Sequence, residues 1–105
     1  MTDLEINISR MDETKGGKLI ATVIGREGEA EMTWSSTGDV LRIVDHTAVA
    51  DSLRGAGVGL ALADRMVEEA RADGVRLYPL CPFFLATARK HPEWHDVVEM
   101  PQAKR

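Results

Sequence analysis

The hydrophobic pattern of this chain changes its period once, and no other feature constrains the fold as much. Before residue 50, apolar and polar residues alternate in several short runs, which is typical of half-buried β-strands. After residue 57, apolar residues return every four positions at Val58, Leu62, Met66 and Ala70, which is typical of an amphipathic helix. The segment 53–59 between them carries three glycines at alternate positions. We therefore expect a sheet that passes into a helix through a glycine-rich turn.

Four strands are predicted before the helix. They cover residues 4–9, 18–24, 30–35 and 40–49, and turn sequences at 25–28 and 36–39 separate the last three, so the strands form an antiparallel meander. The helix is expected to end at Gly74, which fits a C-cap. Beyond it the pattern predicts a strand over 75–80, a helix over 83–90 that Pro92 stops, and a short last strand over 94–98.

The strand over 40–49, the helix and the strand over 75–80 form a β-α-β unit. Such a crossover makes its two strands parallel neighbours or near neighbours. The predicted fold is therefore α+β, a mostly antiparallel sheet with one β-α-β unit, in a single domain over residues 1–105, a length that suits one domain. The three glycines fall at the strand-to-helix turn of this unit, where the N-terminus of the helix opens.

Composition excludes several classes of function. The chain has 13 basic and 17 acidic residues and a net charge of −4, which argues against nonspecific binding to nucleic acid. The sequence has no signal peptide and no apolar run that could span a membrane, so a cytoplasmic location is the expectation. A single cysteine, Cys81, excludes an internal disulfide and a cysteine zinc cluster. His91 and His95 have helical metal spacing, but Pro92 interrupts it, so no metal site is expected.

The glycine turn allows two interpretations. A helix N-terminus exposes unpaired N–H groups, and glycines let a phosphate approach them; the same glycines could instead form only a flexible turn. The dinucleotide fingerprint is excluded because Leu60 stands where its third glycine belongs, and the Gly-Lys-Ser or Gly-Lys-Thr of a P-loop is absent.

The turn Arg54-Gly-Ala-Gly-Val-Gly59 resembles the Arg/Gln-x-x-Gly-x-Gly/Ala signature of the GCN5-related N-acetyltransferases. In that superfamily the turn holds the pyrophosphate of coenzyme A (CoA). Three further motifs, Asp45–Val49, Pro79–Phe83 and His91–Trp94, extend the resemblance to a short, Yjdj-type subfamily, over residues 30–98. The early helices that shape the acceptor site in larger members have no counterpart here, so we expect an open acceptor site.

The resemblance implies a role for each matching position. The backbone N–H groups of the turn would bind the pyrophosphate, and these belong to Arg54, Gly55, Ala56, Gly57, Val58 and Gly59. Val49 would pair its backbone with the pantetheine arm. His46 and Cys81 are the implied catalytic pair near the thioester, and Arg89 or Lys90 would meet the ribose phosphate.

The residues alone leave several roles open. His46 is either a structural histidine of its strand or the base that takes a proton from an incoming amine. Cys81 could attack acetyl-CoA, line or protonate the thiolate site, or only pack in the core. Glu29 and Glu31 form a solvated face or attract a cationic amine.

Three functions follow from these interpretations. The first is an acetyl-CoA-dependent N-acetyltransferase that acts on a small-molecule or peptide amine, either directly or through a cysteine. The alternative is a non-catalytic module that binds CoA or acyl-CoA with the same turn. The third is a structural domain whose glycine turn is merely flexible.

Overall fold

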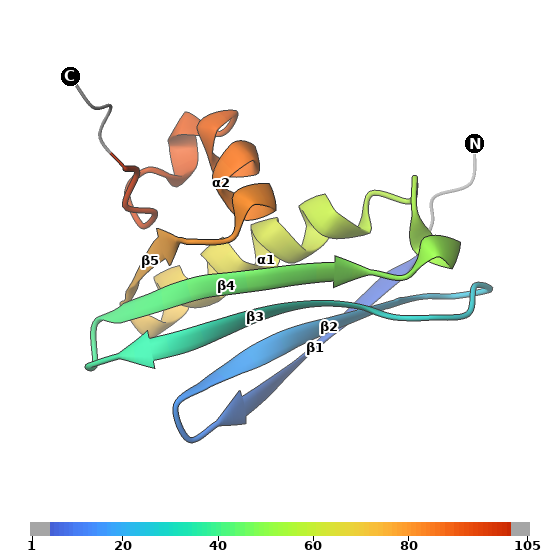
Figure 1. Cartoon of the computed structure of the whole chain (residues 1–105), viewed down its shortest axis with the longest axis horizontal. Helices are drawn as coiled ribbons and strands as arrows, with labels where there is room; N and C mark the ends of the chain where they lie inside the picture. The colour runs from blue at the N-terminus through green and yellow to red at the C-terminus, as the bar shows by residue number, and fades with distance from the viewer. Residues whose placement is uncertain (1–4, 102–105) are drawn as a thin grey trace.

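Four consecutive strands form an antiparallel meander, and a fifth strand joins its end in parallel (Figure 1). The computed structural model describes residues 5–101, so Leu4 of the predicted first strand lies outside the described residues. The strands lie side by side in chain order and are β1 (Ile6–Glu13), β2 (Gly16–Val23), β3 (Ala30–Thr37), β4 (Leu41–Val49) and β5 (Arg76–Pro79). The predicted mostly antiparallel sheet is confirmed.

The helix α1 (Val58–Asp73) connects β4 to β5 and completes the predicted β-α-β unit. Its apolar face packs in one buried cluster with the sheet, and this cluster includes Leu62, Met66 and Ala70 of α1 and Leu19, Met32 and Val44 of the strands. Burial of each large side chain stabilises the fold by about 1.5–3 kcal/mol. The helix ends at Gly74, whose φ of 72° is left-handed. This confirms the predicted C-cap, because glycine adopts that conformation without steric cost.

The second helix, α2 (Pro82–Arg89), follows β5 directly and packs against α1 and β4 at the β5 end of the sheet (Figure 1). Phe84 is buried and stacks on Trp94, with the ring centroids 6.3 Å apart. Trp94 is therefore a core residue. None of the helices within residues 5–101 is long and apolar enough to cross a membrane.

The predicted last strand over 94–98 is wrong. Residues Pro92–Trp94 form the 3₁₀ helix η2, and Val98 makes an isolated parallel bridge to Leu77 of β5. The reason is Pro92, because its fixed φ and missing N–H suit the first turn of a helix better than a strand. The two valines of the segment, Val97 and Val98, are buried and anchor it to β5.

The β1–β2 hairpin extends further than the predicted strands, to a turn at residues 14 and 15. This part of the hairpin packs closely on Trp34, since a Cβ at Gly17 would lie 2.5 Å from the indole ring. The guanidinium groups of Arg10 and Arg42 lie 5.4 and 5.3 Å from that ring. Both arginines donate to Asp73 at the end of α1, so the hairpin, the sheet and the helix are joined there.

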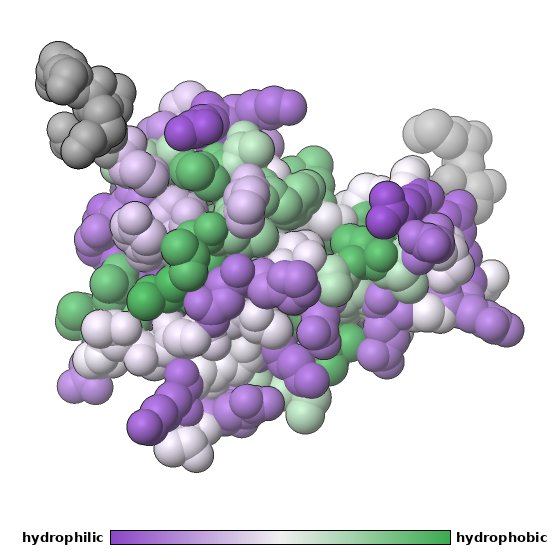
Figure 2. All heavy atoms as spheres, in the orientation of Figure 1, coloured by the Kyte–Doolittle hydropathy of each residue, from purple (hydrophilic) through white to green (hydrophobic). Residues whose placement is uncertain are grey.

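On the face of the molecule seen in Figure 2, hydrophobic side chains form separate patches among hydrophilic ones. The large apolar side chains that remain exposed come from different elements: Met11, Ile24, Val40, Leu60, Tyr78, Leu80 and Phe83. Leu60 of α1 and Phe83 of α2 belong to the groove that is described next.

Candidate functional site

One edge of β4 is open along its last four residues. The pairing of β4 with β5 ends at Val44 opposite Pro79, and the N–H of Cys81 then donates to the carbonyl of Val44 at 2.8 Å. Pro82 starts α2 at once, because proline cannot donate to a ladder but suits the first turn of a helix. Residues 46–49 of β4 therefore pair with β3 alone and leave a free edge where β4 and β5 separate.

The turn from β4 into α1 presents an uncapped helix N-terminus. Gly55 and Gly57 have φ values of 82° and 77°, a left-handed conformation that favours glycine. Gly57 is the N-cap of α1 and makes no capping hydrogen bond through a side chain, and no acidic residue stands in the first turn of the described helix. The first N–H groups of a helix have no partner within it, so they are available to an anion.

The three glycines of the turn have different roles. A Cβ at Gly55 or Gly57 would meet nothing within 4 Å, so open space lies in front of the backbone there. A Cβ at Gly59 would lie 2.7 Å from Cζ of Phe83. Gly59 therefore lets α2 approach α1, whereas the other two glycines set the conformation of the turn.

A groove of about 770 Å³ joins the open edge of β4 to this turn. Its lining includes seven of the predicted binding residues, namely Val49, Arg54, Gly55, Gly57, Val58, Gly59 and Lys90, and also Thr47, Leu53, Leu60, Phe83, Ala86, Thr87 and His91. Ala56 does not line the groove and is partly buried against the core. Among the described lining residues none carries a carboxylate, so the groove suits an anionic ligand with an apolar portion.

The predicted catalytic residues His46 and Cys81 are not brought together. A β-bulge at Asp45 shifts the pairing of β4 with β3, so that His46 lies opposite Thr33. Residues directly opposite each other share a face, and His46 is exposed on the face away from α1. The thiol of Cys81 lies on the other side of β4 and is only 3% exposed. Neither side chain lines the groove.

Cys81 contacts a threonine instead. Its Sγ lies 3.2 Å from Oγ1 of Thr47, and either atom could donate the hydrogen bond. Thr47 is half-buried and lines the groove. Sequence reasoning did not single it out, although the period of two in a strand places Thr47 on the same face as Val49, which had been assigned to the pantetheine arm.

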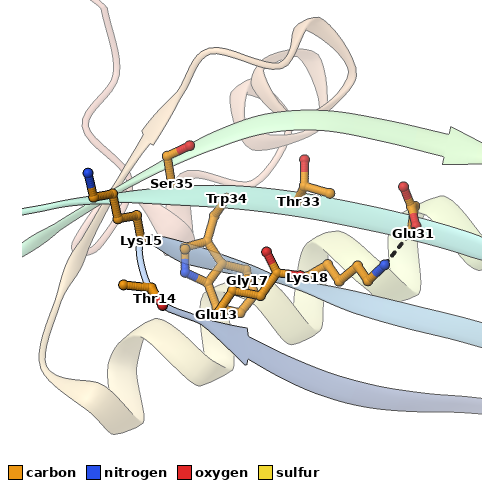
Figure 3. Close-up of a pocket in the computed structure, with 10 residues that line it drawn as sticks. Glu13, Thr14, Lys15, Gly17, Lys18, Glu31, Thr33, Trp34 and Ser35 are labelled. Atoms are coloured by element: carbon orange, nitrogen blue, oxygen red, sulfur yellow. Dashed lines mark ion pairs between the residues drawn. The ribbon is translucent and has the colours of Figure 1, made fainter.

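A second groove, of about 550 Å³, lies over β2, β3 and the turn of the β1–β2 hairpin. Figure 3 shows two of its lining residues, Lys18 and Glu31, as an ion pair, with 3.9 Å between Nζ and Oε1. Glu31, one of the two glutamates considered for amine attraction, is thus engaged by a lysine. This groove contains neither the open edge nor the helix N-terminus, so we place the candidate site in the first groove.

The histidines near α2 bind backbone carbonyl groups. Nδ1 of His91 lies 2.8 Å from the carbonyl oxygen of Thr87, and Nε2 of His95 lies 3.0 Å from that of Ala88. Both carbonyls belong to the last turns of α2, where histidine side chains commonly satisfy free acceptors. Within residues 5–101, no three His, Cys, Asp or Glu side chains are grouped so that they could hold a metal ion.

Comparisons with known proteins identify the family and the fold. Residues 19–97 match the model of a family described as GCN5-related N-acetyltransferase. The chain is also similar to a GCN5-like protein of Staphylococcus aureus whose solution structure was determined by NMR. The two share 28% sequence identity and a TM-score of 0.68, over 100% of this chain and 97% of that one. None of the curated proteins matches the chain.

Proposed function

Because this chain belongs to the GCN5-related N-acetyltransferase family, we propose that it transfers the acetyl group of acetyl-CoA to the amine of a small molecule or peptide. The observation that carries the proposal is the groove in which an open strand edge meets an uncapped helix N-terminus. Acetyl-CoA has a chemical group for each of these features. The amides of its pantetheine arm can pair with a strand edge, and its pyrophosphate suits a helix N-terminus.

The glycine turn is the proposed pyrophosphate site. The open space in front of Gly55 and Gly57 would admit a phosphate to the backbone N–H groups of Gly55, Gly57, Val58 and Gly59. The N–H of Ala56 donates instead to the carbonyl of Leu53 at 3.3 Å. Both the side chain and the backbone N–H of Arg54 donate to Asp51, at 2.9 and 3.2 Å, so Arg54 holds the turn and the pyrophosphate is assigned to the residues that follow it. Lys90 lines the same groove and is proposed to meet the ribose phosphate.

Direct transfer fits this groove better than a relay through cysteine. The thiol of Cys81 is buried and does not line the groove, whereas a nucleophile must reach the carbonyl carbon. In direct transfer the lone pair of the amine forms the new C–N bond, and the C–S bond breaks with its electron pair going to sulfur. The proton lost by the amine is assigned to His46. His46 does not line the groove but is exposed on the other face of β4, so an amine that approaches over the open edge gives up its proton directly or through one water.

The test measures release of CoA thiol from acetyl-CoA in the presence of a panel of amines, together with calorimetric binding of CoA. We expect binding and amine-dependent thiol release. His46→Gln should lower turnover by about 10²–10⁴-fold, the range for loss of a general base, and leave CoA affinity unchanged. Binding without any thiol release would favour the alternative, a non-catalytic CoA-binding module. Absence of both would refute the proposed site.

A covalent route makes a separate prediction. Incubation with acetyl-CoA would then add one acetyl group to the protein, and Cys81→Ser would abolish the adduct in a mass spectrum recorded under mild acid. We expect no such adduct. Its appearance at the rate of turnover would replace direct transfer by a cysteine relay.

A further inference from the structure

Thr47 occupies the end of the groove opposite the glycine turn. It lies two residues before Val49 on the same face of β4, which is a separation of about 6.6 Å along a strand. The groove is lined both by residues of the turn and by this threonine. If the pyrophosphate is bound at the turn, an extended arm that follows the edge of β4 carries its thioester toward Thr47.

Of the two hydroxyl groups that line the groove, that of Thr47 has no carbonyl acceptor within the described part of the chain and can donate into the groove. Oγ1 of Thr87, the second hydroxyl in the lining, donates to the carbonyl of Phe83 at 2.9 Å. Arg54 belongs to the turn at the far end. A hydroxyl has one proton and two lone pairs, and a thiol is a weak donor and a weak acceptor. When the S–H of Cys81 donates to Oγ1 of Thr47, the hydroxyl proton is free to point into the groove.

We propose that the Thr47 hydroxyl, held by the Cys81 thiol, is the catalytic donor that hydrogen-bonds the sulfur of the thioester as the C–S bond breaks. Cys81 is then a positioning residue that acts through Thr47. This inference rests on the proposed acetyl transfer. Charge develops on the sulfur when the electron pair of the C–S bond moves to it, and a hydrogen bond to a charged group is stronger than one to a neutral group. Thr47 keeps its proton throughout, and the proton lost by the amine goes to His46.

The kinetic test compares Thr47→Val, which removes the hydroxyl at nearly constant volume, with Thr47→Ser, which keeps it. We expect Thr47→Val to lower kcat about 10- to 100-fold, with KM for acetyl-CoA within twofold of wild type, and Thr47→Ser to restore most of kcat. Thr22→Val is the matched control, because Thr22 lies on β2 and does not line the groove. Its kcat should equal that of wild type.

A spectroscopic test examines the positioning role. Cys81 is the single cysteine of the chain, so its S–H stretching band in the infrared spectrum is unambiguous. Thr47→Val should shift this band to higher frequency, as expected for loss of an acceptor, and Thr47→Ser should not. Cys81→Ala should lower kcat in the wild type but cause no further loss in Thr47→Val, because both residues serve one hydrogen bond.

These outcomes separate the inference from the proposed function. If the wild-type protein binds CoA but releases no thiol with any amine, acetyl transfer itself is refuted, and the role of Thr47 fails with it. If the wild type turns over and Thr47→Val matches its kcat, only the role of Thr47 is refuted. An unshifted S–H band in Thr47→Val, or fully additive losses in the double variant, would refute the positioning role of Cys81.

Discussion

Substitution of Gly57 separates the two tasks that the glycine turn is proposed to perform. A left-handed conformation costs an L-residue about 1–2 kcal/mol, whereas replacing glycine by alanine restricts the unfolded chain and returns about 0.4–1 kcal/mol. Gly57 has a φ of 77°, and a Cβ there would meet nothing within 4 Å. Gly57→Ala should therefore lose about 1 kcal/mol of stability from backbone strain alone, which lowers Tm by about 4–8 °C in a domain of this size.

The same methyl group would stand in the groove where a phosphate approaches the backbone. Loss of one hydrogen bond to a charged group costs about 1.5–3 kcal/mol, so the affinity for CoA should fall at least tenfold. Gly57→Asn should recover part of the stability, because asparagine tolerates the left-handed region. It should not recover the affinity, because its side chain still occupies the groove.

Gly38 provides the matched control. It lies in the turn between β3 and β4, far from the groove in the chain, with a φ of 67° and open space around a Cβ. Gly38→Ala should lose as much stability as Gly57→Ala in urea unfolding, yet bind CoA with wild-type affinity in calorimetry. Affinity within twofold of wild type for Gly57→Ala would refute the assignment of the pyrophosphate to this turn.

Three further outcomes are expected. Arg42 and Arg10 hold the pKa of Asp73 below its usual value. The stabilisation that this carboxylate provides is therefore present above about pH 4 and is lost as pH falls through the lowered pKa. In urea unfolding, the difference in stability between wild type and Asp73→Asn should shrink over the same fall in pH. Gly59→Ala places a Cβ 2.7 Å from Phe83 and should destabilise by about 1–3 kcal/mol, whereas in a Phe83→Ala background the better helix propensity should stabilise by about 0.5–1 kcal/mol. Lys90→Gln should weaken calorimetric binding of CoA but not of dephospho-CoA.

The sheet and α1 could be predicted from the sequence because the residues that are apolar in the local hydrophobic pattern are the ones that pack in the core. The alternating residues of β2 and β3 face the core in register, and glycines mark both ends of α1 at Gly57 and Gly74. The far end of the β1–β2 hairpin has no such pattern. Its pairing depends on Gly16 and Gly17, which let the hairpin approach Trp34, and this contact between distant residues leaves no periodic signal in the sequence.

The faces of the candidate site were harder to predict, because one residue changes the phase of β4. Val44 is buried, and a period of two would place His46 on the same face. The extra residue at the bulge, Asp45, reverses this alternation. His46 therefore lies on the exposed face, and Thr47 and Val49 lie on the groove side. A shift of one residue moves every later side chain to the opposite face. The local composition does not indicate that a bulge is present.

Because of the same bulge, two neighbouring functional side chains of β4 lie on opposite faces of the strand. His46, a residue that can accept a proton, is exposed on one face, and the hydroxyl of Thr47 lines the groove on the other. In the proposed reaction the amine loses a proton while the sulfur gains negative charge, so a base and a donor are needed at the same time. If both acted from one face, the base would compete for the proton of the donor. The strand between them keeps the two groups apart, and its open edge at residues 46–49 is the place where a proposed thioester could be approached from both sides.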